Sequence, residues 1–129
     1  MRKSLVIGAA ILLAGAANAS ANQEPAGGQL RSMISGKTIY LQTPIGAEVP
    51  VRYMANGTIT GSVSVHLAAL GGEKVSKDVG RWWVRSSQLC QRWNNWSNGQ
   101  AFCYKLSIDG SKVSWVRNDG TSGTARLSK

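Results

Sequence analysis

Residues able to do acid, base or metal chemistry are few and widely spaced in this 129-residue sequence. His66 is the single histidine, and the six carboxylates stand apart, so no metal-ligand spacing and no acid–base pair is visible. The sequence has no Gly-x-Ser-x-Gly nucleophile motif and no glycine loop for phosphates or dinucleotides. We therefore expect a protein that is not an enzyme and that uses no metal and no cofactor.

Tryptophan and arginine are the residue types best suited to binding, and they gather in residues 80–104. The two-residue period of a strand puts Trp82 on one face and Trp83 on the other, between Arg81 and Arg85. Trp82 is therefore a core candidate. Trp83 is a candidate platform for a sugar ring, with the two guanidinium groups for acidic substituents. In the alternative interpretation, the arginine stems only cover the ring on the outside of the fold.

Another aromatic residue, Trp96, stands in the segment 94–99 (NNWSNG), which has the composition of a turn. Packing explains an aromatic side chain less readily in a loop than in a strand. Trp96 is therefore the first candidate for a ligand contact, with Asn95 beside it. The alternative is that Trp96 folds back as a lid over the mouth of the fold. For Trp93 and Trp115 the expectation is core packing.

The two cysteines, Cys90 and Cys103, are the only residues that could form a covalent cross-link. Their spacing is not that of a CxxC redox or metal pair, so in an exported chain they predict one disulfide. The strands flanking residues 94–99 can pair with Cys90 opposite Cys103, which sets Gln88 against Lys105. Closing a loop of this length stabilises a fold by about 3 kcal/mol on the chain-entropy model.

The N-terminal residues have the pattern of an export signal. Two basic residues precede a short apolar run at 5–15, and a small-x-small cleavage pattern ends at Ala19. Residues 1–19 are therefore predicted to be a cleaved signal peptide, residues 20–28 a flexible lead-in, and residues 29–129 one domain. No later segment is apolar enough to cross a membrane. We expect a periplasmic or secreted protein.

The charge of the predicted mature chain limits its partners. Two of the fifteen basic residues and none of the six acidic residues lie in the predicted signal peptide, which leaves a net charge of +7. Such a balance favours anionic saccharides or anionic lipid head groups. The basic residues are scattered singly with no Lys/Arg run. Nucleic acid is therefore not expected, and charge that serves only solubility is an equally good interpretation.

The remaining pattern predicts one short helix followed by many short strands. Residues 29–35 place three apolar side chains at helical spacing ahead of Gly36, and this helix is expected to plug or pack against the end of a sheet. Asn-Gly and Asp-Gly pairs at 56–57 and 109–110 indicate hairpin turns. Seven or eight such strands form an antiparallel meander, and closure into a barrel would remove its exposed edges.

The middle of the chain gives the least regular pattern. Residues 58–66 are predicted to form a strand that ends at His66, with a bend or bulge at Gly61. Residues 67–72 fit either a helical turn or a continued strand. Residues 73–80 are predicted to be an exposed, charged connection with at most one short strand.

The order of glycine, tryptophan and cysteine residues resembles that of a known group of proteins. The pattern comprises D-x-G-x-W-x-V at 78–84, L-C-x-x-W at 89–93, C-Y at 103–104, D-G at 109–110 and W-x-x-x-D-G at 115–120. It is similar to small exported bacterial proteins with a lipocalin-like or avidin-like β-barrel and no assigned activity. The resemblance implies a fold and a compartment, and it brings no catalytic residues.

These observations predict an all-β protein, a small antiparallel meander closing into a lipocalin-like or avidin-like barrel, and a monomer. The predicted function is non-catalytic binding of an anionic envelope saccharide or a lipid-like ligand. The alternative is a protein-interaction module, an inhibitor, adhesin or effector, that reaches a protein partner through the loop Asn94 to Gly99.

Overall fold

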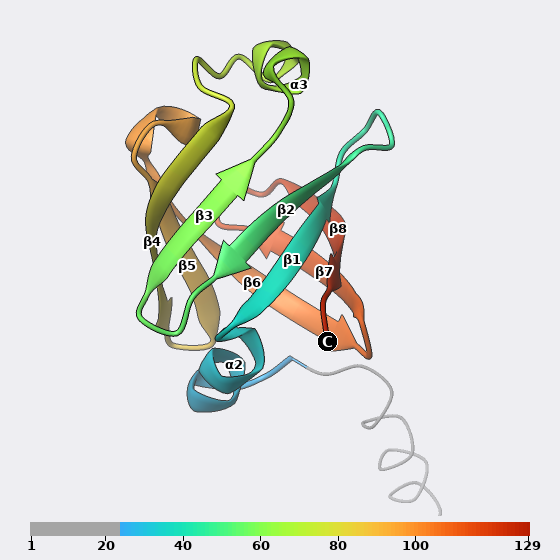
Figure 1. The fold of residues 1–129 in the computed structure, drawn as a ribbon. Helices are drawn as coiled ribbons and strands as arrows, with labels where there is room; N and C mark the ends of the chain where they lie inside the picture. Colours follow the sequence, from blue (N-terminus) through green and yellow to red (C-terminus); the bar gives the residue numbers. More distant parts are fainter. Residues whose placement is uncertain (1–23) are drawn as a thin grey trace, which may run out of the picture.

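The computed structural model describes residues 24–129, so the predicted signal peptide at residues 1–19 lies outside the described part. Eight strands follow one another as an antiparallel meander, and the first pairs with the last to close a barrel (Figure 1). The all-β meander and its closure are thus confirmed. The strands are β1 (Lys37–Gln42), β2 (Glu48–Tyr53), β3 (Thr58–Ser62), β4 (Lys77–Arg85), β5 (Gln88–Trp93), β6 (Ala101–Asp109), β7 (Lys112–Arg117) and β8 (Ser122–Leu127).

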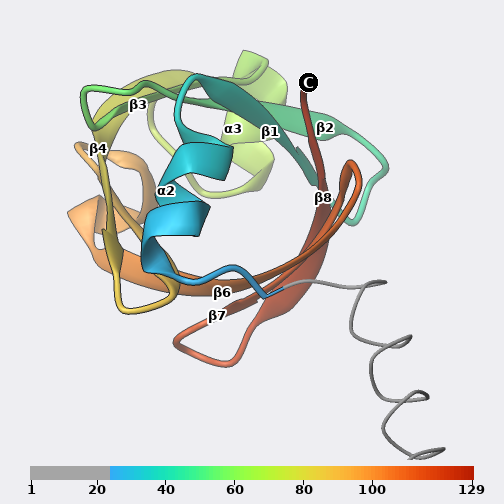
Figure 2. The ribbon, with the colours of Figure 1, turned by 90° about the horizontal axis from the view of Figure 1, so that it is seen from below.

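Helix α2 (Gly27–Ile34) lies across one end of the barrel (Figure 2). Leu30 and Ile34 point into the barrel and have no exposed surface, because their i, i+4 spacing puts them on one helix face. The helix begins two residues before its predicted start, so Gly27 is not part of a flexible lead-in. A Cβ at Gly27 would come within 2.6 Å of the Ser86 carbonyl oxygen, so a glycine here lets the helix approach the barrel closely.

The segment between β3 and β4 differs from its prediction. β3 ends at Ser62, because the Ser64 hydroxyl accepts a hydrogen bond from the Leu67 N–H (3.0 Å) and starts helix α3 (Val65–Leu70) instead. His66 is consequently an exposed residue of α3 rather than a strand end. β4 begins at Lys77, inside the segment predicted to be a connection. Among the described residues, no helix has the length and hydropathy needed to cross a bilayer.

The predicted hairpin turns and the cysteine pairing are confirmed. Gly57 and Gly110 have φ angles of 92° and 62°, as the Asn-Gly and Asp-Gly turns require. Cys90 lies opposite Cys103 in the β5–β6 ladder, and the two form a disulfide with an S–S distance of 2.06 Å. The disulfide lies on the outer face of the barrel, since the neighbouring Leu89 lines the interior.

Candidate ligand-binding cavity

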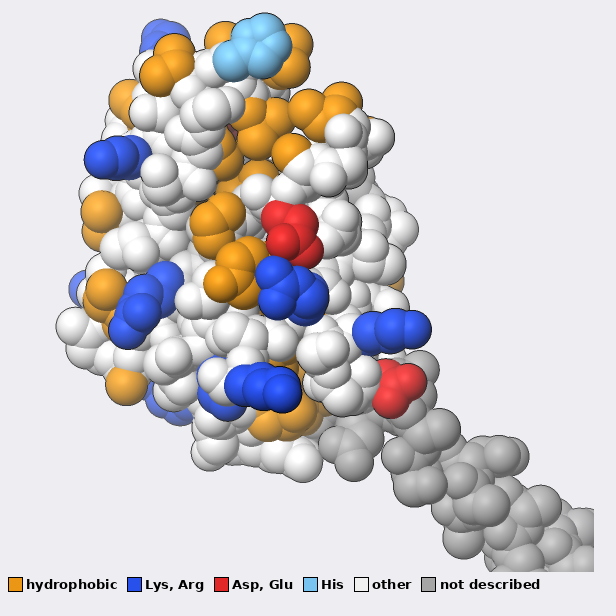
Figure 3. All heavy atoms as spheres, turned by 45° about the vertical axis from the view of Figure 1, so that its right-hand side comes forward, with side chains coloured by type: hydrophobic (Ala, Val, Ile, Leu, Met, Phe, Trp, Pro, Cys, Tyr) orange, Lys and Arg blue, Asp and Glu red, His pale blue; other side chains and the backbone are white. Residues whose placement is uncertain are grey.

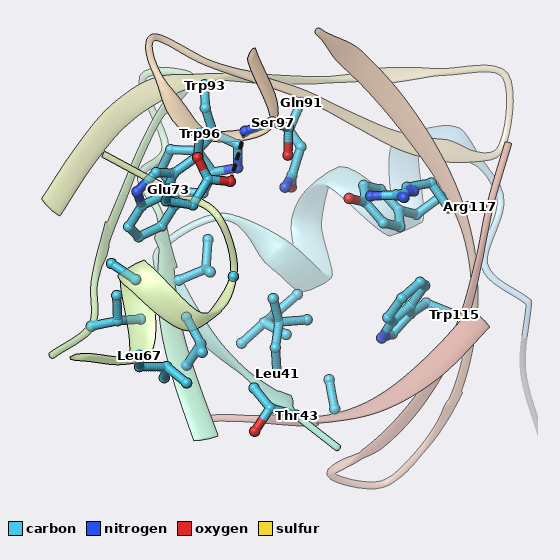
Figure 4. Close-up of a pocket in the computed structure, with 18 of the residues that line it drawn as sticks. Leu41, Thr43, Leu67, Glu73, Gln91, Trp93, Trp96, Ser97, Trp115 and Arg117 are labelled. Carbon is cyan, nitrogen blue, oxygen red and sulfur yellow. Dashed lines mark hydrogen bonds between the residues drawn. The ribbon is translucent and has the colours of Figure 1, made fainter. Parts of the chain in front are cut away.

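The barrel interior is an open cavity of about 640 Å³. Helix α2 lies behind it, and its mouth is at the other end, between the β1–β2 loop, α3 and the β5–β6 loop (Figures 1 and 4). Apolar side chains make most of the wall because every second residue of a barrel strand points inward. The aliphatic residues of the wall are Ile39, Leu41, Val49, Val51, Val63, Leu89, Leu106, Val113 and Ala125.

Aromatic side chains stand on two opposite sides of this cavity (Figure 4). Trp93 and Trp96 pack together on one side with ring centroids 4.7 Å apart. Trp115 stands on the other side, edge to face with Tyr104 at 5.5 Å. The space between them is therefore bounded by flat, polarisable surfaces that suit hydrocarbon chains and rings.

Two glycines make room for two of these tryptophans. A Cβ at Gly61 would lie 2.5 Å from the Trp96 ring, and a Cβ at Gly123 would lie 2.5 Å from the Trp115 ring. Each indole thus lies flat against strand backbone. The predicted role of Gly61 was a bend or bulge, and the structure adds a packing reason for a glycine there.

Asp78 holds Trp96 in its place at the mouth. One carboxylate oxygen accepts hydrogen bonds from the N–H groups of Asn95 (2.8 Å) and Trp96 (2.7 Å), and the other accepts from the Asn95 amide (3.1 Å) and the Val79 N–H (2.9 Å). Burial raises the pKa of the Asp78 carboxyl, but these hydrogen bonds outweigh it and the net shift is downward. Asp78 is therefore a charged, buried anchor for the loop.

The Trp96 side chain is also held in place, by a hydrogen bond and by burial. Its indole N–H donates to the Val75 carbonyl oxygen at 2.8 Å, and the ring retains only 8 % exposure. The next N–H in the chain, that of Ser97, donates to a carboxylate oxygen of Glu73 at 3.0 Å (Figure 4). The loop therefore folds back against the barrel, as in the alternative for Trp96, but the ring forms one side of the cavity and leaves the mouth open.

Polar groups inside the cavity are few. The Tyr53 hydroxyl donates to the Gln91 side-chain oxygen at 2.6 Å, and burial raises the pKa of Tyr53, so this phenol stays protonated. The bond leaves the amide N–H groups of Gln91 for another acceptor. The Trp115 indole N–H is buried and has no hydrogen-bond partner among the described residues. That nitrogen is packed against strand β8 at Gly123 and is not exposed to the cavity, so the amide of Gln91 is the donor that a ligand can reach.

Arg117 is the one basic side chain that lines the cavity within the described residues. Its guanidinium binds Asp119 through two hydrogen bonds of 3.0 and 2.7 Å and lies over the Phe102 ring at 4.1 Å. The hydrogen bonds from Arg117 lower the pKa of Asp119, so the pair stays ionised. Because Asp119 neutralises it, Arg117 does not present a free positive charge to the cavity.

Of the residues predicted to bind a ligand, only Trp96 lines the cavity. Asn95 lies next to it in the β5–β6 loop, where its side-chain amide donates a hydrogen bond to Asp78. The structure puts Arg81, Trp83 and Arg85 on the outer wall, because Trp82 of the same strand faces the interior and is 3 % exposed. The five predicted residues therefore form two separate groups, one at the mouth and one outside.

The outer group surrounds the disulfide. Trp83 lies opposite Cys90 in the β4–β5 ladder, and an Arg85 guanidinium nitrogen is 3.7 Å from the Cys103 sulfur. Cys90 has no exposed surface, in keeping with a side chain covered by its neighbours. Trp83 is itself half-buried, and Arg81 and Arg85 are exposed.

Sequence reasoning missed the contributions of Tyr53, Asp78, Gln91 and Trp115. The alternation of Leu89, Gln91 and Trp93 would have put Gln91 on an inward face, but only the closed barrel brings it to Tyr53 from β2. Asp78 gave no local signal of its role, because its partners lie seventeen and eighteen residues further along the chain.

Comparison with known proteins leaves the family open. No family model, curated protein or solved structure compared with this chain gives a match. Within residues 24–129, no group of three or more His, Cys, Asp or Glu side chains is placed to hold a metal ion. The function is therefore argued from the cavity and its surroundings.

Proposed function

We propose that this is a non-catalytic binding protein that holds a lipid-like molecule in its barrel. The observation that carries the proposal is the apolar cavity of about 640 Å³. Small-molecule sites typically measure about 300–1,000 Å³ and are lined by hydrophobic and aromatic side chains with a few polar groups. Protein interiors are otherwise close-packed, so an open barrel of this size supports a role in binding.

The polar groups of the cavity favour a ligand that carries an acceptor. The amide N–H groups of Gln91 are donors, and a carbonyl, hydroxyl or carboxyl oxygen would accept hydrogen bonds from them. Burial of a donor without a partner costs about 1–3 kcal/mol, so this pairing would add to the affinity. The ligand class is thus an amphiphile with an apolar body and an oxygen-bearing group.

The experiment is a titration with a fluorescent fatty acid, followed by probe emission and by quenching of tryptophan emission. We expect saturable binding with one site per chain. Leu41→Trp fills the cavity and should abolish binding, whereas Val116→Trp on the exposed outer wall should leave the affinity unchanged. Equal binding by the wild type and Leu41→Trp would refute the proposal.

Anionic saccharide is a second candidate ligand, on the outer wall rather than in the cavity. Arg81 and Arg92 lie directly opposite each other in the β4–β5 ladder, and neither has an ion pair among the described residues. Like charges in such a position repel each other, and a bound anion would relieve the repulsion. Trp83 lies two residues along β4 and supplies an aromatic face. Loss of binding to a uronic-acid oligosaccharide in Arg81→Gln, with cavity binding intact, would assign this second site.

The protein-interaction alternative receives less support from the geometry. Its loop, residues 94–99, has Trp96 buried in the cavity wall, so the aromatic anchor expected at the centre of an interface is not on the surface. We propose further that the protein is exported, with a lipocalin-like or avidin-like barrel and a location in the periplasm or outside the cell. The disulfide supports an oxidising compartment.

A further inference from the structure

Exposed apolar side chains are concentrated at the open end of the barrel. Among the described residues, the most exposed large hydrophobic side chains are Val65 (76 %), Ile45 (66 %) and Leu70 (63 %). Ile45 belongs to the β1–β2 loop, while Val65 and Leu70 belong to α3, and both elements stand at the mouth (Figure 1). We call these three side chains the apolar rim. The remaining two, Val116 (51 %) and Val79 (47 %), lie on the outer walls.

The apolar rim is continuous with the cavity wall. Ile45 and Leu70 line the cavity although more than half of each side chain is exposed, and Pro44 and Leu67 line it beside them. Figure 3 shows hydrophobic side chains around a hollow at the upper end of the molecule, next to the single histidine. A ligand leaving the cavity at this point would pass over these apolar side chains.

Two exposed lysines beside the mouth offer contacts for an anionic partner. Four carboxylates lie at this end: Glu48 and Asp119 form ion pairs with Arg126 and Arg117, whereas Glu73 and Asp78 accept hydrogen bonds from backbone N–H groups. Lys74 and Lys77 follow α3, are exposed, and have no ion pair among the described residues. An anionic lipid bilayer accepts apolar side chains at its surface and carries negative charge beside them, so it fits both the apolar rim and the two lysines.

We infer that the open end of the barrel docks on an anionic bilayer with the apolar rim in the head-group region and the two lysines at the lipid phosphates. The mouth then faces the membrane, and a lipid-like ligand passes between bilayer and cavity without crossing water. This exchange rests on the proposed function, whereas docking itself rests on the rim and its charges.

Co-sedimentation with vesicles tests the docking, using the chain without residues 1–19. The wild type should partition onto vesicles that contain phosphatidylglycerol and much less onto pure phosphatidylcholine. The triple variant Ile45→Ser, Val65→Ser, Leu70→Ser should lose binding by a factor on the order of one hundred, because binding scales with the apolar area that is buried. The matched control, Val79→Ser with Val116→Ser, replaces exposed valines away from the mouth and should bind as the wild type does.

The lysines are tested separately from the rim. Lys74→Gln with Lys77→Gln should reduce binding to anionic vesicles by about fivefold per lysine and leave the weak binding to phosphatidylcholine unchanged. Unfolding midpoints of all variants check that the barrel is intact. Equal vesicle binding by the rim triple variant and the control would overturn the inference, and so would no binding of the wild type to anionic vesicles. Failure of the fluorescent fatty acid to bind, with rim-dependent docking retained, would overturn the proposed function alone.

Discussion

A helix stands at each end of this barrel, but α2 closes its end whereas α3 leaves the other end open. At the closed end, α2 inserts Leu30 and Ile34 into the barrel with no exposed surface. At the open end, α3 buries only Ala68 and leaves Val65 and Leu70 in solvent. Figures 1 and 2 show α2 lying across its end and α3 standing beside the mouth. One end therefore contributes to stability, while the other is available for a ligand and a partner.

This difference shows that a barrel can divide stability and binding between its ends. The closed end is packed, and its side chains stabilise the fold by dispersion attraction and by burial of apolar surface, as in an ordinary protein core. At the open end, the β5–β6 loop is held by hydrogen bonds to Asp78 and Glu73 as well as by packing. Four predictions test this division, starting with the largest expected effect.

Replacement of Ile34 by alanine should destabilise the protein by about 3 kcal/mol, because it leaves a void in a fully packed site. Val65→Ala at the open end should change the free energy of unfolding by less than about 0.5 kcal/mol, because the side chain is 76 % exposed. Urea unfolding measures both. Equal losses at the two ends would contradict the division.

Removal of the disulfide by Cys90→Ala with Cys103→Ala should lower the free energy of unfolding by about 3 kcal/mol. The two cysteines are 13 residues apart, and the bond restricts the unfolded chain. The bond also joins the two strands whose connecting loop carries Trp96. Thermal unfolding of the wild type with and without reductant should show the same loss as the double variant. No change on reduction would mean that the ladder alone holds this hairpin.

Acid should destabilise the protein by protonating Asp78, which holds the β5–β6 loop in place. The folded-state pKa of Asp78 is lower than its ordinary value of 3.8. The stability it contributes is therefore complete above about pH 5 and is lost as the pH falls through the lowered pKa. Asp78→Asn should reduce stability at neutral pH by about 2 kcal/mol and flatten the pH dependence below pH 4. Urea unfolding between pH 3 and pH 7 measures this, with Asp109→Asn in an exposed turn as the control.

Gly61→Ala should have the smallest of these effects and act on the mouth alone. The added methyl group would lie 2.5 Å from the Trp96 ring, so the ring must shift, at a cost of about 1 kcal/mol. Tryptophan emission should move to longer wavelength as Trp96 becomes more exposed. Gly28→Ala in α2 is the control, because no atom lies within 4 Å of the added group. An unchanged emission spectrum of Gly61→Ala would contradict the prediction, because it would show that Trp96 does not become more exposed.

Several features of the fold were predictable because they depend on near neighbours in the chain. Asn56-Gly57 and Asp109-Gly110 form turns since glycine readily adopts the positive φ angle that each requires. The alternation of a strand was enough to assign Trp82 to the core, where its indole N–H donates to the Met54 carbonyl oxygen at 2.7 Å. The register that joins Cys90 to Cys103 follows from the short loop between their strands.

The candidate site could be predicted only in part. The sequence singles out Trp96 by its place in a polar loop, but it does not show that Trp96 is buried, because the groups that hold it come from Val75, just before β4, and from Asp78 in β4. The segment at Ser64 was predicted as strand, since a single hydroxyl cap decides between a strand and a short helix there.

The sequence by itself determined the strand order, the turns, the disulfide and the inward or outward direction of most side chains, because each depends on spacing along a few residues. Only the tertiary structure decided that the interior is open, that Trp96 is buried in its wall, and that apolar side chains lie around its mouth. The physical reason is that these features depend on the radius at which eight strands close and on contacts between segments far apart in the chain.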